Sequence, residues 1–176
     1  MNKILVDIAK QYLWVRETGV NNIAPEIQTM QKATWLKPGA WPWCSAFCCH
    51  VLKMALLDPE YADYIHSRYN IVGTLENWRC KDASAFGWIS WAKKLQLTAK
   101  HKDLILFDEK FTAKAGDFVI YDFSHIGIVT NQIAGSGIIQ TIEGNTAPKT
   151  TQRDGVNDGV YEMTRKDTLL KSYIRL

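Results

Sequence analysis

The most constraining feature of the chain is an apolar segment at residues 44–57, which lies between Pro42 and the pair Asp58-Pro59. The polar residues inside it are Ser45, His50 and Lys53. A proline is well tolerated in the first turn of a helix and a later proline marks a helix end, so the segment predicts one helix. Because a helix that is apolar nearly all round must be covered on most sides, we expect this helix to be central and buried.

Helical patterns occupy the first part of the chain, and strand patterns occupy the last part. Apolar residues recur at helical spacing from Ile4 to Val15, and Gly19 is expected to stop this helix. Two more helices are predicted over residues 25–33 and 83–95. Short β-branched or aromatic runs, separated by turn residues, predict strands at 118–121, 126–129, 138–142, 160–163 and 173–176. Helices followed by antiparallel strands predict an α+β fold.

Length and composition favour a single domain spanning residues 1–176. With 47% hydrophobic and 22% charged residues, the chain suits one core and leaves little room for a second domain. The net charge of +3 is too small to indicate a nucleic-acid partner. No run approaches the roughly 18 apolar residues of a membrane helix, so we expect no stable membrane insertion. The first apolar run ends at Asp7, so we expect no signal peptide and synthesis in the cytoplasm.

Cys44 stands in the expected first turn of the central helix, in the run Trp41-Pro42-Trp43-Cys44. A helix N-terminus stabilises a thiolate by up to ~2 kcal/mol in good geometry, which makes the cysteine a moderate nucleophile. A histidine partner would lower the thiol pKa much further. Trp41 and Trp43 flank the thiol, and we expect them to wall a substrate groove. Taken alone, however, a cysteine in an apolar helix is usually a core residue, and so is each tryptophan.

The remaining cysteines are Cys48, Cys49 and Cys80. We interpret Cys48 and Cys49 as core residues of the central helix. Three cysteines within six residues are poorly spaced for a disulfide framework, so reduced thiols are expected. The spacing of these cysteines and His50 matches none of the usual zinc patterns, and we expect no metal.

Among the four histidines, His125 is the best partner for a nucleophile. It opens a predicted strand and shares a face of that strand with Gly127, whose missing side chain leaves space for another group. A glycine-rich turn and a second strand follow, so a hairpin is expected. If the hairpin is centred on residue 134, His125 lies opposite Glu143; if it is centred on residue 135, His125 faces Asn145. Either side chain could orient the imidazole and leave its other nitrogen for the thiol.

Several motifs occur together in one order along the chain. They are Asn21-Asn22 with Pro25, Trp43-Cys44-Ser45-Ala46-Phe47, Gly116-Asp117-Phe118-Val119-Ile120-Tyr121, His125-Ile126-Gly127-Ile128-Val129 and Ile142-Glu143-Gly144-Asn145-Thr146. Together they resemble the CHAP family of cysteine amidohydrolases and peptidases, which is close to the NlpC/P60 group within the papain-like fold. The resemblance runs over residues 16–165, which is nearly the whole chain.

This resemblance implies a papain-like α+β fold and a peptidoglycan hydrolase. Enzymes of this family cleave an amide bond of the stem peptide or cross-bridge, or the amide that joins the stem peptide to the sugar. They usually act as bacteriophage endolysins or bacterial autolysins. By motif position, Cys44 is implied to be the nucleophile, His125 the base, Glu143 the residue that orients the histidine, and Asn145 a supporting polar residue. These roles favour the hairpin centred on residue 134.

The resemblance also implies the partners and the setting. Bacterial cell-wall peptidoglycan is the expected partner, and an immunity or inhibitor protein is a further candidate. We expect a monomer without a separate cell-wall-binding module, a metal requirement or a cofactor. Without a signal peptide, the protein would reach the cell wall by release on lysis, by holin-type passage or by injection. Residues 58–82 and 98–113 make the middle of the chain longer than the resemblance leads us to expect, and they would wall or cap the groove.

Two other functions stay open from the sequence alone. The chain could be a non-catalytic wall-binding or interaction module on the same fold, although an intact Cys–His–Glu set argues against loss of activity. It could also be a cysteine protease that acts on proteins, which would apply the same chemistry to another substrate.

Overall fold

The computed structural model describes residues 3–100, 105–108, 111–147 and 157–176. The helices in these ranges are α1 (Lys3–Lys10), α2 (Pro25–Gln31), α3 (Cys44–Ala55), α4 (Pro59–Arg68), α5 (Leu75–Trp78) and α6 (Gly87–Thr98). The strands are β1 (Leu106–Phe107), β2 (Phe118–Tyr121), β3 (His125–Gln132), β4 (Ile138–Thr146), β5 (Gly159–Lys166) and β6 (Leu170–Ile174). The predicted α+β fold, with helices before antiparallel strands, is confirmed.

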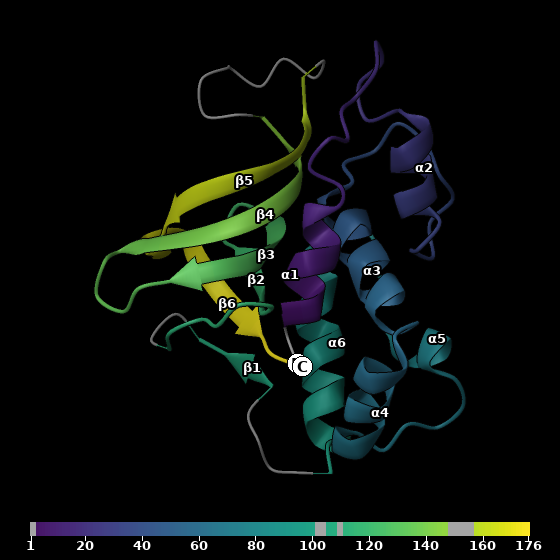
Figure 1. The fold of residues 1–176 in the computed structure, drawn as a ribbon, viewed down its shortest axis with the longest axis vertical. Coiled ribbons are helices and arrows are strands. Elements are labelled where there is room, and N and C mark those ends of the chain that lie inside the picture. The colour runs from purple at the N-terminus through teal and green to yellow at the C-terminus, as the bar shows by residue number, and fades with distance from the viewer. Residues whose placement is uncertain (1–2, 101–104, 109–110, 148–156) are drawn as a thin grey trace.

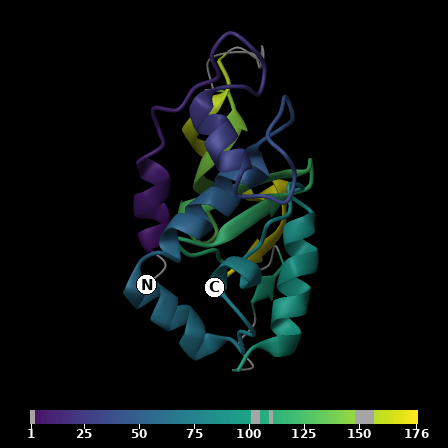
Figure 2. The same ribbon diagram turned by 90° about the vertical axis from the view of Figure 1, so that its right-hand side faces the viewer.

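The strands form one antiparallel sheet in the order β1-β6-β2-β3-β4-β5. Strands β2 to β5 are neighbours in chain order, and β6 returns to lie between β1 and β2. The helices lie on one side of this sheet (Figure 1). The view of the helical side shows α3 between α1 and α6, with the sheet behind them (Figure 2). Strands β3 and β4, next to each other in the sheet, carry the predicted histidine, glutamate and asparagine.

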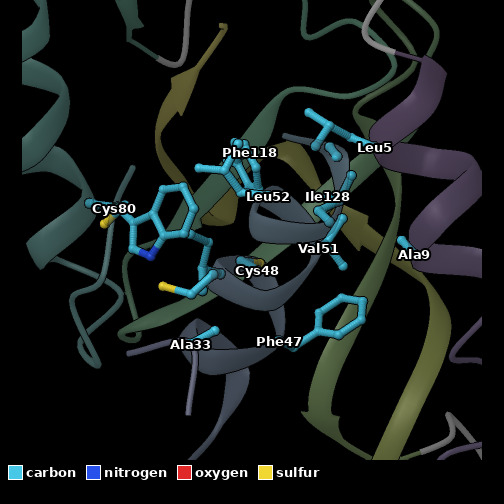
Figure 3. Close-up of a cluster of buried hydrophobic side chains, with 14 of the residues drawn as sticks. Leu5, Ala9, Ala33, Phe47, Cys48, Val51, Leu52, Cys80, Phe118 and Ile128 are labelled. Carbon is cyan, nitrogen blue, oxygen red and sulfur yellow. The ribbon is translucent and has the colours of Figure 1, made fainter. Parts of the chain in front are cut away.

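Helix α3 is the centre of the fold, as its apolar sequence predicts. It packs against α1 and α2 and against β3 and β4. All of its residues except Lys53 and Met54 are buried. Figure 3 shows Phe47, Val51 and Leu52 of this helix among side chains from the sheet and from α1. A smaller apolar cluster, which includes Val119, Tyr121, Val129 and Ile139, is separate from this core.

The largest differences from the predicted helix bounds occur in the first helix and in the helix predicted over 83–95, and tertiary contacts explain the first of them. The first helix ends at Lys10 rather than near Gly19. Arg16 pairs with Gly159, and the Val15 carbonyl accepts the Val160 N–H at 3.1 Å, so this segment leaves the helix to meet β5. The predicted helix over 83–95 begins only at Gly87 and continues to Thr98.

The pair Asp58-Pro59 starts a helix as well as ending one. The Asp58 carboxylate accepts the Tyr61 N–H at 2.9 Å, and Pro59 fills the first turn of α4. The segment 58–82 therefore holds α4 and α5, which the sequence did not resolve. Part of the segment 98–113 lies outside the described residues. None of the helices in the described ranges combines the length and apolar character needed to cross a bilayer.

Candidate active site

Cys44 is the first residue of α3, and a distant strand caps this end of the helix. The Trp43 backbone N–H donates to Asn145 Oδ1 at 3.3 Å, where no local side chain provides a cap. The first N–H groups of a helix have no carbonyl partner within it, so this end is positively polarised. The backbone N–H groups of Ser45 and Ile126 also lower the pKa of the Cys44 thiol by hydrogen bonding. The thiol therefore lies where an anion is stabilised.

His125, the first residue of β3, lies close enough to the Cys44 thiol for its charge and its hydrogen bonding to act on the pKa of that thiol. Burial raises the pKa of the Cys44 thiol, but the charge and hydrogen bond of His125 and the two backbone N–H groups bring that pKa below its ordinary value. Burial lowers the pKa of His125, but Cys44 and Glu143 together raise it to about 9. These contacts favour the charged form of each group, a thiolate beside an imidazolium.

Glu143 reaches the histidine from β4. His125 Nε2 donates to Glu143 Oε2 at 2.9 Å, which leaves Nδ1 as the ring nitrogen for Cys44. The Glu143 side chain has no exposed surface. Burial raises the pKa of Glu143, but the hydrogen bonds and charges of His125 and Arg165 lower it to about 2, so the carboxylate is ionised at neutral pH. The structure thus brings Cys44, His125 and Glu143 together.

Three further side chains hold the Glu143 carboxylate, and the sequence did not single them out. Thr141 Oγ1 and Tyr121 Oη donate to Oε1 at 2.6 Å and 3.0 Å. Arg165 Nη2 donates to Oε2 at 2.5 Å, and Arg165 Nε donates to Oε1 at 3.1 Å. The period of two along β4, which puts Thr141 on the same face as Glu143, was the signal available for Thr141.

The strand register at the site differs from the one that the family resemblance favours. Ile128 pairs with Ile142, so the hairpin here is centred on residue 135 rather than 134. In this register Gly127, not His125, lies across from Glu143. The Glu143 side chain crosses the space over Gly127, where a Cβ atom would lie 2.7 Å from Glu143 Cγ. The predicted direct opposition of His125 and Glu143 is therefore wrong, because the two residues meet as diagonal neighbours.

Replacing Gly127 with alanine is expected to displace Glu143 from His125. The new methyl group would also lie 3.2 Å from the Ile142 carbonyl oxygen, so β3 and β4 cannot absorb it without shifting. We expect the free energy of unfolding to fall by about 1–3 kcal/mol, and turnover to fall by roughly 10- to 100-fold. Thermal unfolding and steady-state kinetics measure the two effects. Asn131→Ala, at an exposed position of the same strand, is the control; a Gly127→Ala protein with wild-type turnover would contradict the expectation.

Asn145 lies at the start of α3, where β4 bends over the helix. Its Nδ2 donates to Asn22 Oδ1 at 2.9 Å and to Glu17 Oε1 at 3.2 Å. Its φ of 54° lies in the left-handed region, which asparagine tolerates better than most residues. The pairing of β4 with β5 is irregular between Glu143 and Thr146, so the amide turns toward the N-terminal segment and the helix start.

Trp43 does not wall a groove, contrary to the prediction. It has no exposed surface, and its Nε1 donates to Glu17 Oε1 at 2.9 Å. Its indole lies against β4 so closely that a Cβ atom on Gly144 would be 2.8 Å from the ring. Trp41, in contrast, is partly exposed and lines the cavity, with its Nε1 donating to the Lys37 carbonyl at 2.8 Å.

A cavity of about 530 Å³ opens at Cys44, His125 and Asn145. Three other segments line the cavity. Before α3 these are Trp35, Leu36, Trp41 and Pro42, before α6 they are residues 82–85, and between β2 and β3 they are Phe123 and Ser124. Ser45 holds the second segment in place, because its Oγ donates to the Asp82 carbonyl at 2.6 Å and accepts from Trp88 Nε1 at 2.8 Å. Trp35 and Phe123 are 67% and 50% exposed, so two large apolar side chains that the sequence did not single out as walls face the cavity.

Cys48, Cys49 and His50 also carry groups that could do chemistry, but their surroundings differ from those of Cys44 and His125. Burial raises the pKa of Cys48 and of Cys49 well above the ordinary value, so both are neutral thiols at neutral pH. His50 shares a hydrogen bond of 2.8 Å with Tyr12 Oη, and burial lowers the pKa of His50 to about 4. Within the described residues, no three His, Cys, Asp or Glu side chains are grouped so as to hold a metal ion.

Comparison of the chain with protein-family models finds no match, and comparison with the curated proteins finds none either.

Proposed function

We propose that the protein is a cysteine-dependent amide hydrolase, with Cys44 as nucleophile, His125 as acid and base, and Glu143 as the residue that orients the histidine. The observation that carries this proposal is the chain of contacts from a buried thiol with a lowered pKa, through His125, to an ionised carboxylate, all beside an open cavity. A nucleophile, a base and an orienting group in this order are what covalent amide hydrolysis requires.

The reaction would proceed in two steps. The Cys44 thiolate attacks the amide carbonyl carbon, and a thioester forms as the carbon–nitrogen bond breaks, while His125 gives its proton to the leaving amine. Neutral His125 then removes a proton from water, whose oxygen attacks the thioester; the carboxylic acid leaves, and the Cys44 thiolate beside protonated His125 is regenerated. The Cys44 backbone N–H at the positive end of α3 is our candidate donor to the carbonyl oxygen as that oxygen becomes negative.

The substrate we propose is an amide bond of bacterial peptidoglycan, in the stem peptide, in the cross-bridge or between peptide and sugar. The resemblance of the Cys44, His125 and Glu143 motifs to those of the CHAP family supports this substrate and a papain-like arrangement of the fold. The cavity is compatible with it, because flat apolar side chains such as Trp35, Trp41 and Phe123 line it and can pack against a sugar or peptide.

Digestion of purified peptidoglycan tests the substrate directly. The protein is incubated with peptidoglycan and, in parallel, with an unfolded protein such as reduced casein, and new chain ends are identified by mass spectrometry. New amino and carboxyl ends in peptidoglycan alone support the proposal and identify the bond. Cleavage of casein alone would replace it by a protease acting on proteins. No cleavage of either substrate, from protein whose Cys44 alkylates slowly, would favour a binding module.

Turnover is expected to follow a bell-shaped pH profile with its alkaline side near pH 9. Leaving-group departure needs protonated His125, and the pKa of His125 is raised to about 9, so activity is present below that pH and is lost as pH rises through it. Activity also falls on the acid side, as pH drops through the lowered pKa of Cys44 and the thiolate is protonated. Initial rates at constant ionic strength measure both sides; an alkaline side near pH 6.5, the ordinary histidine value, would contradict this expectation.

A further inference from the structure

We propose that Arg165 is a positioning residue of this site, because it holds the Glu143 carboxylate and cancels the carboxylate's charge. Glu143 can then orient His125, and His125 is still able to release its proton. The inference rests on the proposed function, in that His125 must pass a proton to the leaving amine. It concerns a strand, β5, that contributes none of the proposed catalytic residues.

The contacts of Arg165 with Glu143 are those of a two-point clamp. Nη2 donates to Oε2 and to Thr146 Oγ1, while Nε donates to Oε1 and lies 3.2 Å from Oε2. Paired donors in this geometry fix the plane of a carboxylate as well as its distance. Oε2, the oxygen that receives Arg165 Nη2, is also the oxygen that receives His125 Nε2. Arg165 therefore sets the direction from which the carboxylate meets the imidazole.

The charge of Arg165 matters because Glu143 is completely buried. Tyr121 and Thr141 are neutral donors to Oε1, so they orient the carboxylate without neutralising it. The Arg165 side chain keeps 22% of its surface exposed, which lets the cation remain hydrated while its donors reach the buried anion. Together, Glu143 and Arg165 form a nearly neutral orienting group beside the Cys44–His125 pair.

A neutral orienting group has a chemical consequence for the leaving-group step. The groups that face His125 are Cys44 from α3, Glu143 from β4, and the Tyr121 and Phe123 rings, whose centroids lie 6.0 Å and 5.7 Å from the imidazole. The anions among these favour the imidazolium, and Arg165, behind Glu143, is the cation that opposes them. Without Arg165, the full charge of a buried carboxylate would hold the proton on His125, and proton transfer to the amine would become harder.

Two substitutions at one position separate the charge of Arg165 from its geometry. Arg165→Gln removes both, and we expect the pKa of His125 to rise by about one to two units. Turnover near neutral pH should fall by roughly 10- to 100-fold. The alkaline side of the pH profile of turnover should move to higher pH by the same amount as the His125 pKa. Arg165→Lys keeps the charge but loses the two-point clamp, so the His125 pKa should stay near the wild-type value while turnover falls by a smaller factor.

The His125 pKa is measured by NMR titration of the imidazole ring, with its signal identified by loss in His125→Ala. This readout needs no substrate, so it separates this inference from the proposed function. If the wild-type protein hydrolyses no amide but the pKa of His125 is raised in the Arg165→Gln variant as expected, the role of Arg165 is supported and the proposed function is wrong. If turnover is present and the folded Arg165→Gln protein has an unchanged or lower His125 pKa, the role of Arg165 is wrong.

A double substitution guards against loss of folding, since Arg165→Gln leaves a buried carboxylate without its cation. Glu143→Gln with Arg165→Gln removes both charges and leaves no buried charge without a partner. Because the role of Arg165 is to hold Glu143 and offset its charge, losing Arg165 should cost no further turnover once Glu143 is uncharged, and the double variant should match Glu143→Gln in turnover within about twofold. Its His125 pKa should lie below that of Arg165→Gln, because the buried carboxylate charge is gone. Independent, additive losses in the double variant would overturn the inference.

Discussion

Replacing Cys44 with alanine is expected to abolish amide hydrolysis, with turnover reduced by at least about 10⁴-fold. The substitution removes the sulfur that forms the thioester, and no other described thiol can take its place. Cys48, one turn further along α3, is fully buried, and burial holds its pKa well above the ordinary value. The rate of peptidoglycan solubilisation, normalised to folded protein by circular dichroism, measures the loss.

Cys48→Ala is the matched control for this substitution, because it removes a sulfur from the same helix without touching the His125 contact. It should keep turnover near the wild-type rate and lose only the stability that a small buried group supplies, about 1–2 kcal/mol. A Cys44→Ala protein that cleared cell walls as fast as Cys48→Ala would exclude the thiol mechanism, whatever the substrate.

The position of Cys44, the proposed nucleophile, could be predicted from the sequence because its cause is local. An apolar run between two prolines can bury itself only as a central helix, and Cys44 stands in the first turn of that helix. The strands are local in the same sense, since each is a short run of β-branched and aromatic residues between turns. Helix ends are harder to predict, because Val15 and Arg16 do not extend α1 but contact β5, which lies far away in the sequence.

The pairing of His125 with Glu143 was predicted for a reason that is only partly correct. The period of two along each strand brings both residues to one face in either register, so parity alone could not choose between them. The structure adopts the register centred on residue 135 and still joins the two residues, because Gly127 leaves the space that the Glu143 side chain crosses. The small residue beside His125 was a visible signal, whereas the diagonal contact that it permits was not.

The remaining differences arise from long-range packing. The position of Trp43 next to Cys44 predicts that it walls a groove. Successive residues around a helix start point in different directions, however, and its indole faces Glu17 and Gly144. Arg165 reaches Glu143 from the edge strand, and this contact depends on how β4 and β5 align on either side of residues 147–158. No local pattern encodes that alignment.

Replacing His125 with alanine is expected to reduce turnover by roughly 10³- to 10⁴-fold and to deactivate Cys44 itself. Burial raises the pKa of the Cys44 thiol, and His125 provides the main opposing effects, its charge and its hydrogen bond. Once the imidazole is removed, the burial effect dominates, and the thiol should be protonated at pH 6. Alkylation of Cys44 by iodoacetamide at that pH should therefore slow by at least about tenfold.

Two companion variants identify the cause of that loss. His66→Ala removes an exposed histidine and should leave both turnover and alkylation unchanged. Glu143→Gln should lose less turnover than His125→Ala, because the amide oxygen can still accept from His125 Nε2 and the ring stays beside the thiol. If Cys44 in His125→Ala were alkylated at the wild-type rate at pH 6, the helix end and the backbone N–H groups of Ser45 and Ile126 would be sufficient to activate the thiol, and His125 would act on the leaving group alone.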